Sequence, residues 1–255
     1  MFSRRNLFKA SAALSLGACA SSQTSVTEET NGAISSPAPL DEVDFDLMTA
    51  ADDPVFGDSS GVATVGTGNS RHDEVRTAFR LLWDTPRTDD HMEIARYFEN
   101  LSTKNPNATN SSGQIASYNE EWVGTSNPLI TSFFGMTSVK PYNGDQTFWC
   151  AAFVSFVLYA AGKPNMLSAL SGAYRRYSAP TADPKVGDVV VFRKNGPEGD
   201  QGFGHVGFFV AQSDDYIQVL GGNQRGNSGS TGAVVTTRYE KYGSTLSYHS
   251  FRTVV

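Results

Sequence analysis

Apolar residues recur at the spacing of an amphipathic helix in two stretches near the beginning of the regularly patterned part of the chain. Pro86 lies between these stretches, so the pattern predicts two short helices in a helical preface over residues 71–110. The polar run KNPNATNSSGQ that follows predicts a loop. The apolar positions of the two helical stretches are Val75, Phe79, Leu82, Ile94, Phe98 and Leu101.

The stretch FWCAAFVSFVLYAAG, residues 148–162, is apolar on all sides. Such a pattern predicts a central helix that other elements cover, and Gly162 marks its end. Asp145 and Thr147 are candidate caps just before it, which would place Cys150 in the first helical turn. The preceding run EEWVGTSNPLITSFFG predicts one short helix within irregular structure.

After residue 186 the pattern changes to alternation, or to short runs rich in β-branched and aromatic residues. These runs predict five strands, whereas residues 163–185 predict a loop with one short helix at most. Helices followed by a run of strands indicate an α+β fold, in which N-terminal helices pack on an antiparallel sheet of about five strands. The predicted strands are GDVVVF (187–192), GHVGFFV (204–210), YIQVLGG (216–222), GAVVTTRY (232–239) and LSYHSFRTV (246–254).

The chain opens with MFSRRNLFKASAALSLGACASS, in which two arginines precede an apolar stretch too short to span a bilayer. SRRNLFK resembles a twin-arginine export signal, and LGAC resembles the lipobox of bacterial lipoproteins. We therefore expect residues 1–19 to be a signal peptide with lipidation at Cys19; a plain signal peptide that contains a cysteine is the alternative. Because Ala20 follows the cysteine, this resemblance favours a lipid-anchored protein on the periplasmic face of the outer membrane of a Gram-negative bacterium.

Residues 20–70 hold nine acids and no Lys or Arg, and they lack apolar periodicity. Such a segment cannot bury enough apolar surface to offset its ordering entropy, so we expect a disordered acidic tether rather than a loop packed on the domain. Residues 71–255 hold 17 acidic and 17 basic residues, so the net charge of −6 does not arise there. No basic stripe argues for a nucleic acid as partner.

Three residues in the later part of the chain could together perform nucleophilic catalysis. Cys150 is the only cysteine after the leader, and a helix N-terminus or a neighbouring imidazolium lowers the pKa of a thiol. His205 lies in GFGHVGFFV, where flanking glycines would let the cysteine helix or a substrate approach closely. Asn223 follows two glycines in VLGGNQ, and an amide oxygen can hold the second nitrogen of a catalytic imidazole. Taken singly, each also fits a structural role. The other histidines, expected to be structural or exposed, are His72, His91 and His249.

WCAAFVSFVLYAAG, VGDVVVF, GHVGFFV and VLGGNQ, in this order, resemble the CHAP amidohydrolase/peptidase family of the papain-like, NlpC-type superfamily. The resemblance implies that residues 111–255 form a catalytic domain. It implies Cys150 as nucleophile, His205 as general base and acid, and Asn223 as the residue that orients the imidazole. Many family members carry a glutamate where this chain has Gly221. The third role therefore depends on Asn223 or on a residue that the motifs do not identify.

This resemblance implies a cysteine hydrolase that cleaves amide bonds in peptidoglycan, as an endopeptidase or an N-acetylmuramoyl-L-alanine amidase, without a cofactor. A zinc site would need three or four ligands at characteristic spacing, which the sequence lacks. Gln146 is a candidate oxyanion-hole side chain, although a capping or exposed role fits it equally. The alternatives are a catalytically inactive CHAP-like lipoprotein that binds the wall, and a transglutaminase-like acyltransferase that uses an amine in place of water.

Overall fold

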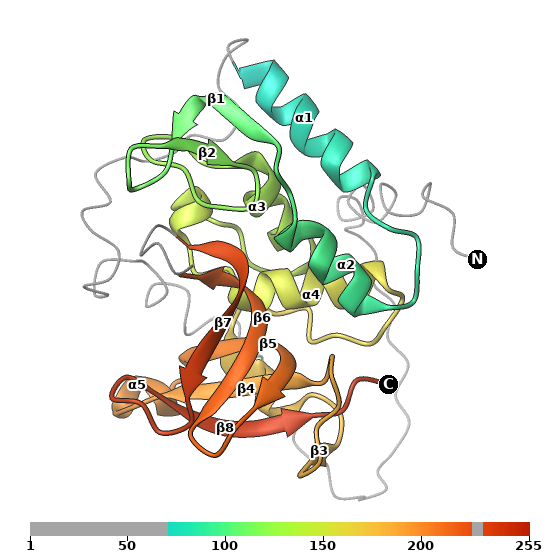
Figure 1. Ribbon diagram of the computed structural model, residues 1–255, viewed down its shortest axis with the longest axis vertical. Helices are drawn as coiled ribbons and strands as arrows, with labels where there is room; N and C mark the ends of the chain where they lie inside the picture. The colour runs from blue at the N-terminus through green and yellow to red at the C-terminus, as the bar shows by residue number, and fades with distance from the viewer. Residues whose placement is uncertain (1–70, 226–231) are drawn as a thin grey trace, which may run out of the picture. The chain divides into compact units, whose positions relative to one another are not determined.

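The computed structural model describes residues 71–225 and 232–255, and Figure 1 shows how their helices and strands are arranged. The predicted signal peptide, the lipidation of Cys19 and the tether over residues 20–70 lie outside the described residues. Within the described ranges, no helix combines the length and the apolar character that crossing a bilayer requires.

Both helices predicted for the preface are present, as α1 and α2, and a side-chain cap explains where α2 begins. The Asp90 carboxylate accepts hydrogen bonds from the backbone N–H groups of Met92 and Glu93, at 2.8 and 3.3 Å. The short helix predicted before the cysteine is α3, and its N-cap Asn127 accepts from the backbone N–H of Leu129 at 2.9 Å. The helices are α1 (His72–Trp83), α2 (His91–Glu99), α3 (Pro128–Phe133), α4 (Cys150–Ala160) and α5 (Pro197–Asp200), with 3-10 helices η6 (Phe134–Met136), η7 (Gly144–Gln146) and η8 (Ser171–Arg176).

The prediction of a loop after α2 is wrong, because this segment forms a small antiparallel hairpin. Its strands are β1 (Lys104–Thr109) and β2 (Ile115–Ser117). The Asn110 side-chain oxygen organises the turn, since it accepts hydrogen bonds from two backbone N–H groups at 3.0 and 3.1 Å. The hairpin buries mainly small apolar side chains, Ala108 and Ala116. Strands this polar carry no clear apolar alternation, so the hydrophobic pattern did not indicate them.

The five predicted strands are all present, and a short sixth strand, β3, joins them in one antiparallel sheet. The strand order is β3-β8-β4-β5-β6-β7, so the last strand of the chain lies between β3 and β4. The predicted α+β fold is therefore confirmed, with six strands in place of about five. The strands are β3 (Pro180–Thr181), β4 (Val189–Lys194), β5 (Gly204–Gln212), β6 (Tyr216–Gln224), β7 (Ala233–Glu240) and β8 (Leu246–Arg252).

Helix α4 occupies the centre of the core, as its apolar sequence predicted (Figure 1). All of its residues from Cys150 to Leu158 are buried. The helix packs on β5 and β6 and also contacts α2 and α3. From α2, the Phe98 ring meets those of Phe153 and Phe156 at centroid distances of 6.2 and 5.6 Å. The preface thus shares its core with the helix that carries the cysteine.

Candidate active site

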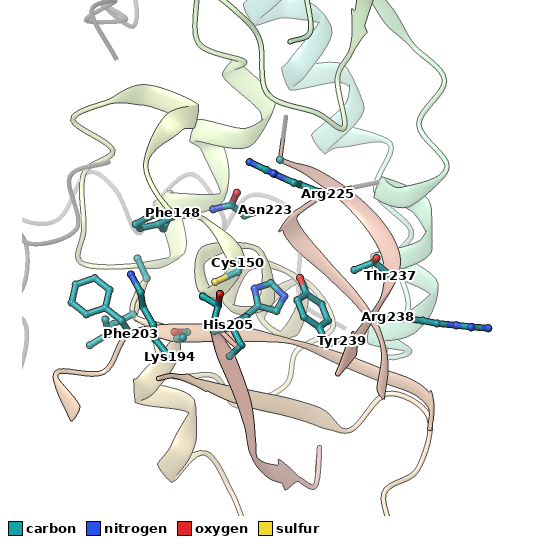
Figure 2. A pocket seen from close by; sticks show the side chains of 17 residues that line it. Phe148, Cys150, Lys194, Phe203, His205, Asn223, Arg225, Thr237, Arg238 and Tyr239 are labelled. Atoms are coloured by element: carbon teal, nitrogen blue, oxygen red, sulfur yellow. The ribbon is translucent and has the colours of Figure 1, made fainter. Parts of the chain in front are cut away.

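A cavity of about 450 Å³ lies beside the N-terminus of α4, among residues of β4 to β8 (Figure 2). The structure brings the three predicted residues, Cys150, His205 and Asn223, together in its wall. A thiol, an imidazole and an amide that converge from separate elements on one cavity are the arrangement that an active site requires. Other lining residues include Phe148, Lys194, Phe203, Arg225, Arg238 and Tyr239.

Cys150 is the first residue of α4, but neither predicted cap holds the start of this helix. The N-cap residue is Trp149, and no side chain caps the helix there. Asp145 is buried and accepts hydrogen bonds at 2.8 and 2.9 Å from two backbone N–H groups of the segment 122–127. The Thr147 hydroxyl accepts from a backbone N–H of its own turn at 3.3 Å. Both side chains therefore stabilise the approach to α4, and the capping prediction is wrong.

Burial decides the protonation state of the Cys150 thiol. The residue is only 6% exposed, and desolvation raises the pKa of the thiol to about 11. Backbone N–H groups of Val206, Ala151 and Cys150 itself oppose this rise. The helix N-terminus therefore lowers this pKa as expected, but burial outweighs its effect in the free protein. The same N–H groups are nevertheless placed to stabilise negative charge that develops close to the sulfur.

His205 is buried near the start of β5, where its ring stacks on Tyr239 with a centroid distance of 4.9 Å and an interplanar angle of 28°. Burial lowers the pKa of His205 to about 4, and the hydrogen bond that the ring makes to the side-chain oxygen of Gln224 acts in the opposite direction. The imidazole is therefore neutral at pH 7, which leaves it able to accept a proton.

The glycines around His205 are not the ones that admit the cysteine helix, although Gly204 lines the cavity. A Cβ on Gly204 would lie 2.0 Å from the carbonyl oxygen of Phe192, so this glycine lets β4 approach β5. The glycine that admits the cysteine helix is Gly222, on which a Cβ would lie 2.4 Å from the ring of Trp149. Close approach of α4 to the sheet therefore depends on β6, and the expectation for the glycines beside His205 is corrected.

Gln224, and not Asn223, holds the imidazole of His205. The Oε1 atom of Gln224 lies 2.9 Å from Nε2 of His205. The amide nitrogen of Gln224 donates to the backbone carbonyl oxygens of three strand residues, two of them at 3.2 Å, so the amide oxygen must face the ring. Nε2 of His205 therefore donates, and Nδ1 is the ring nitrogen left to accept a proton. The residue that orients the imidazole is therefore Gln224, one position after the predicted Asn223.

A bulge in β6 explains why the amide of Gln224, and not that of Asn223, reaches the imidazole of His205. The observed pairing of Phe208 with Leu220, continued regularly, would place Asn223 opposite His205. Instead, the register against β7 shifts just before Gln224, and Asn223 has a φ of 54°, in the left-handed region. The extra residue brings Gln224 to the imidazole.

Asn223 instead joins the start of α4 to a buried carboxylate, Glu121, that the sequence analysis missed. The neighbours orient the Asn223 amide so that Nδ2 donates to Glu121 Oε1 and Oδ1 accepts from the backbone N–H of Trp149, each at 3.2 Å. Glu121 also accepts from Trp149 Nε1 at 2.8 Å and from the backbone N–H of Gly232 at 2.9 Å. Burial, followed by the nearby Asp145, raises the pKa of Glu121 to about 8. This network fixes Trp149, the residue that immediately precedes Cys150.

The remaining candidate side chains lie outside the cavity. Gln146 hydrogen-bonds to Asp145 and does not line the cavity. His91 Nε2 lies 2.8 Å from a backbone carbonyl oxygen, and His72 and His249 are exposed. In the part of the chain that the structure describes, no three His, Cys, Asp or Glu side chains are grouped as ligands for a metal ion.

One protein-family model matches the part of the chain that carries Cys150 and His205. Residues 141–223 match the family model of the CHAP domain. The matched segment contains Cys150 and His205 and ends one residue before Gln224, while Glu121 precedes it. No curated protein and no solved structure matches the chain.

Proposed function

We propose that this protein is a peptidoglycan hydrolase that cleaves an amide bond, with Cys150 as nucleophile and His205 as general base and acid. One observation carries the proposal. A single cavity holds the thiol together with an imidazole whose tautomer Gln224 fixes, inside a segment that matches the CHAP domain. The resemblance to CHAP enzymes supports peptidoglycan as the substrate.

The proposed reaction begins with two neutral groups, since burial raises the pKa of the thiol and lowers that of the imidazole. Nδ1 of His205 takes the thiol proton while the Cys150 sulfur attacks the amide carbonyl carbon. Backbone N–H groups at the start of α4 stabilise the oxyanion, and Gln224 Oε1 stabilises the imidazolium. The imidazolium then protonates the leaving amine as the C–N bond breaks. Water, deprotonated by His205, finally hydrolyses the thioester and restores the thiol.

The decisive experiment measures solubilisation of purified peptidoglycan by the wild type and by Cys150→Ser. We expect the variant to lose turnover and to keep the thermal unfolding midpoint of the wild type, since the substitution changes little volume. Full activity of folded Cys150→Ser would overturn the proposal. A wild type that binds wall fragments without cleaving them would point to the inactive wall-binding alternative. Mass spectrometry of the products identifies the bond that is cut, and added amine reveals acyl transfer.

We also propose that the protein is exported and anchored through Cys19 to the outer membrane, facing the periplasm, with residues 20–70 as a tether. The lipobox-like LGAC and the acidic, aperiodic composition of the following segment support this. Labelling of cells with a fatty-acid analogue should mark the wild type and not Cys19→Ala, and Cys19→Ala should leave the membrane fraction. An unlabelled wild type would contradict the anchor.

A further inference from the structure

The charged side chains that line the cavity are all cationic. Among the residues that the structure describes, they are Lys194, Arg225 and Arg238, and no Asp or Glu lines the cavity. Residues 71–255 carry equal numbers of acids and bases, so this imbalance belongs to the cavity and not to the domain. A wall of one sign raises the local concentration of ligands of the opposite sign.

Two of these cations lie where they could touch a bound substrate. Lys194 is the last residue of β4, and Arg225 directly follows β6. Figure 2 shows the Lys194 side chain to one side of Cys150 and the Arg225 side chain near Asn223, whereas Arg238 points away. The two positive charges therefore reach the cavity from separate segments of the chain.

The acids that neighbour these two cations do not line the cavity. Lys194 Nζ lies 3.5 Å from Glu198 Oε1 on the protein surface, where an exposed ion pair is weak. Arg225 is close enough to the buried Glu121 to lower the pKa of that carboxyl, although burial dominates it. Neither carboxyl group lines the cavity, so the charged side chains that a ligand would meet there are cationic.

We infer that the cavity selects a substrate with a free carboxylate close to the amide that is cleaved, and that Lys194 and Arg225 bind this carboxylate. The inference rests on the proposed function and narrows it, because the stem peptides of peptidoglycan carry both free carboxylates and amide bonds. Phe148 and Phe203 also line the cavity, and their rings can cover the hydrocarbon part of such a peptide. A lysine and an arginine can each bind a carboxylate by charge-assisted hydrogen bonds.

The test compares two muropeptides that differ only in one group, a stem carboxylate that is either free or converted to a carboxamide. We expect the wild type to prefer the free carboxylate by about 10- to 100-fold in kcat/KM, the range for hydrogen bonds to charged groups. Lys194→Gln and Arg225→Gln should each reduce this preference, and the double variant should bring it close to one. Arg193→Gln is the matched control, because its side chain pairs with Asp200 at 2.5 Å outside the cavity. It should keep the wild-type preference.

Binding to Cys150→Ala, measured by calorimetry with the same two muropeptides, tests the carboxylate site without turnover. Tighter binding of the free carboxylate, lost in Lys194→Gln and Arg225→Gln, supports the inference. Equal affinity for the two peptides overturns it, even if the wild type cleaves both. If the wild type cleaves neither peptide while Cys150→Ala distinguishes them, the carboxylate site stands and the proposed hydrolysis fails.

Discussion

Replacing Gln224 by methionine tests whether this amide sets the tautomer of His205. Methionine has a similar length and no hydrogen-bonding amide, so the space stays filled while Nε2 of His205 loses its acceptor at 2.9 Å. A buried donor without an acceptor costs about 1–3 kcal/mol. The same energy separates the productive tautomer, with the proton on Nε2, from the unproductive tautomer, with the proton on Nδ1.

From this energy we expect kcat/KM for Gln224→Met to fall by about 5- to 150-fold, through kcat and with little change in KM. The assay is hydrolysis of soluble muropeptides, with thermal unfolding to establish that the variant is folded. Nitrogen-15 NMR of labelled histidine reports the tautomer directly and does not depend on turnover. Gln218→Met is the matched control, since Gln218 lies half-buried on the same strand and outside the cavity.

The reasoning is refuted if folded Gln224→Met keeps the wild-type kcat and His205 keeps its proton on Nε2. It is also refuted if Asn223→Ala, and not Gln224→Met, changes the histidine tautomer. In that case Asn223 would reach the imidazole as the resemblance to CHAP enzymes implies.

Three further predictions concern Cys150 and the residues that support the start of α4. Because burial raises the pKa of Cys150 to about 11, the thiolate fraction falls as the pH drops below that value. Alkylation by iodoacetamide, followed by mass spectrometry, should therefore accelerate steadily from pH 7 to 10, and a plateau near pH 6 would contradict this. Gly222→Ala puts a Cβ 2.4 Å from Trp149 and should destabilise the fold by about 1–3 kcal/mol in urea unfolding, whereas Gly135→Ala, which meets nothing within 4 Å, should not. Glu121→Ala should lower the free energy of unfolding by more than about 3 kcal/mol in the same measurement, because three hydrogen-bond donors lose their acceptor. Glu121→Gln should lower it by less. Equal losses for the two variants would show that the acceptor atoms of Glu121 are unimportant.

The sequence predicted those helices and strands whose buried residues form a regular or continuous apolar pattern. The apolar run of α4 and the β-rich runs after residue 186 predicted a central helix and five strands, and all are present. The hairpin β1–β2 was missed because its order comes from polar side chains such as Asn110, which leave no hydrophobic period.

The candidate site was predictable in its composition but not in its connections. Cys150 and His205 lie in one cavity as expected, whereas the bulge that brings Gln224 to the imidazole depends on strand register. Gly221, the departure from the family pattern, is part of the explanation. A Cβ there would lie 3.3 Å from Cδ of Gln224, so the missing side chain leaves room for this amide. The role of Glu121 could not be predicted from the sequence, because the residues to which it hydrogen-bonds lie far from it along the chain.

The hydrogen bonds between Glu121 and Gly232 also determine when the site can assemble during folding. The backbone N–H of Glu121 donates to the carbonyl oxygen of Gly232, and the backbone N–H of Gly232 donates to the Glu121 side chain. The two residues are 111 positions apart, so closing the chain between them costs about 4 kcal/mol of entropy. Local contacts such as those within α4 form without this cost. The anchor for the start of α4 is completed only when β7 has joined the sheet, which makes the cavity a late, non-local product of folding. A fragment limited to residues 141–223 would carry the cysteine and the histidine and still lack both ends of this closure.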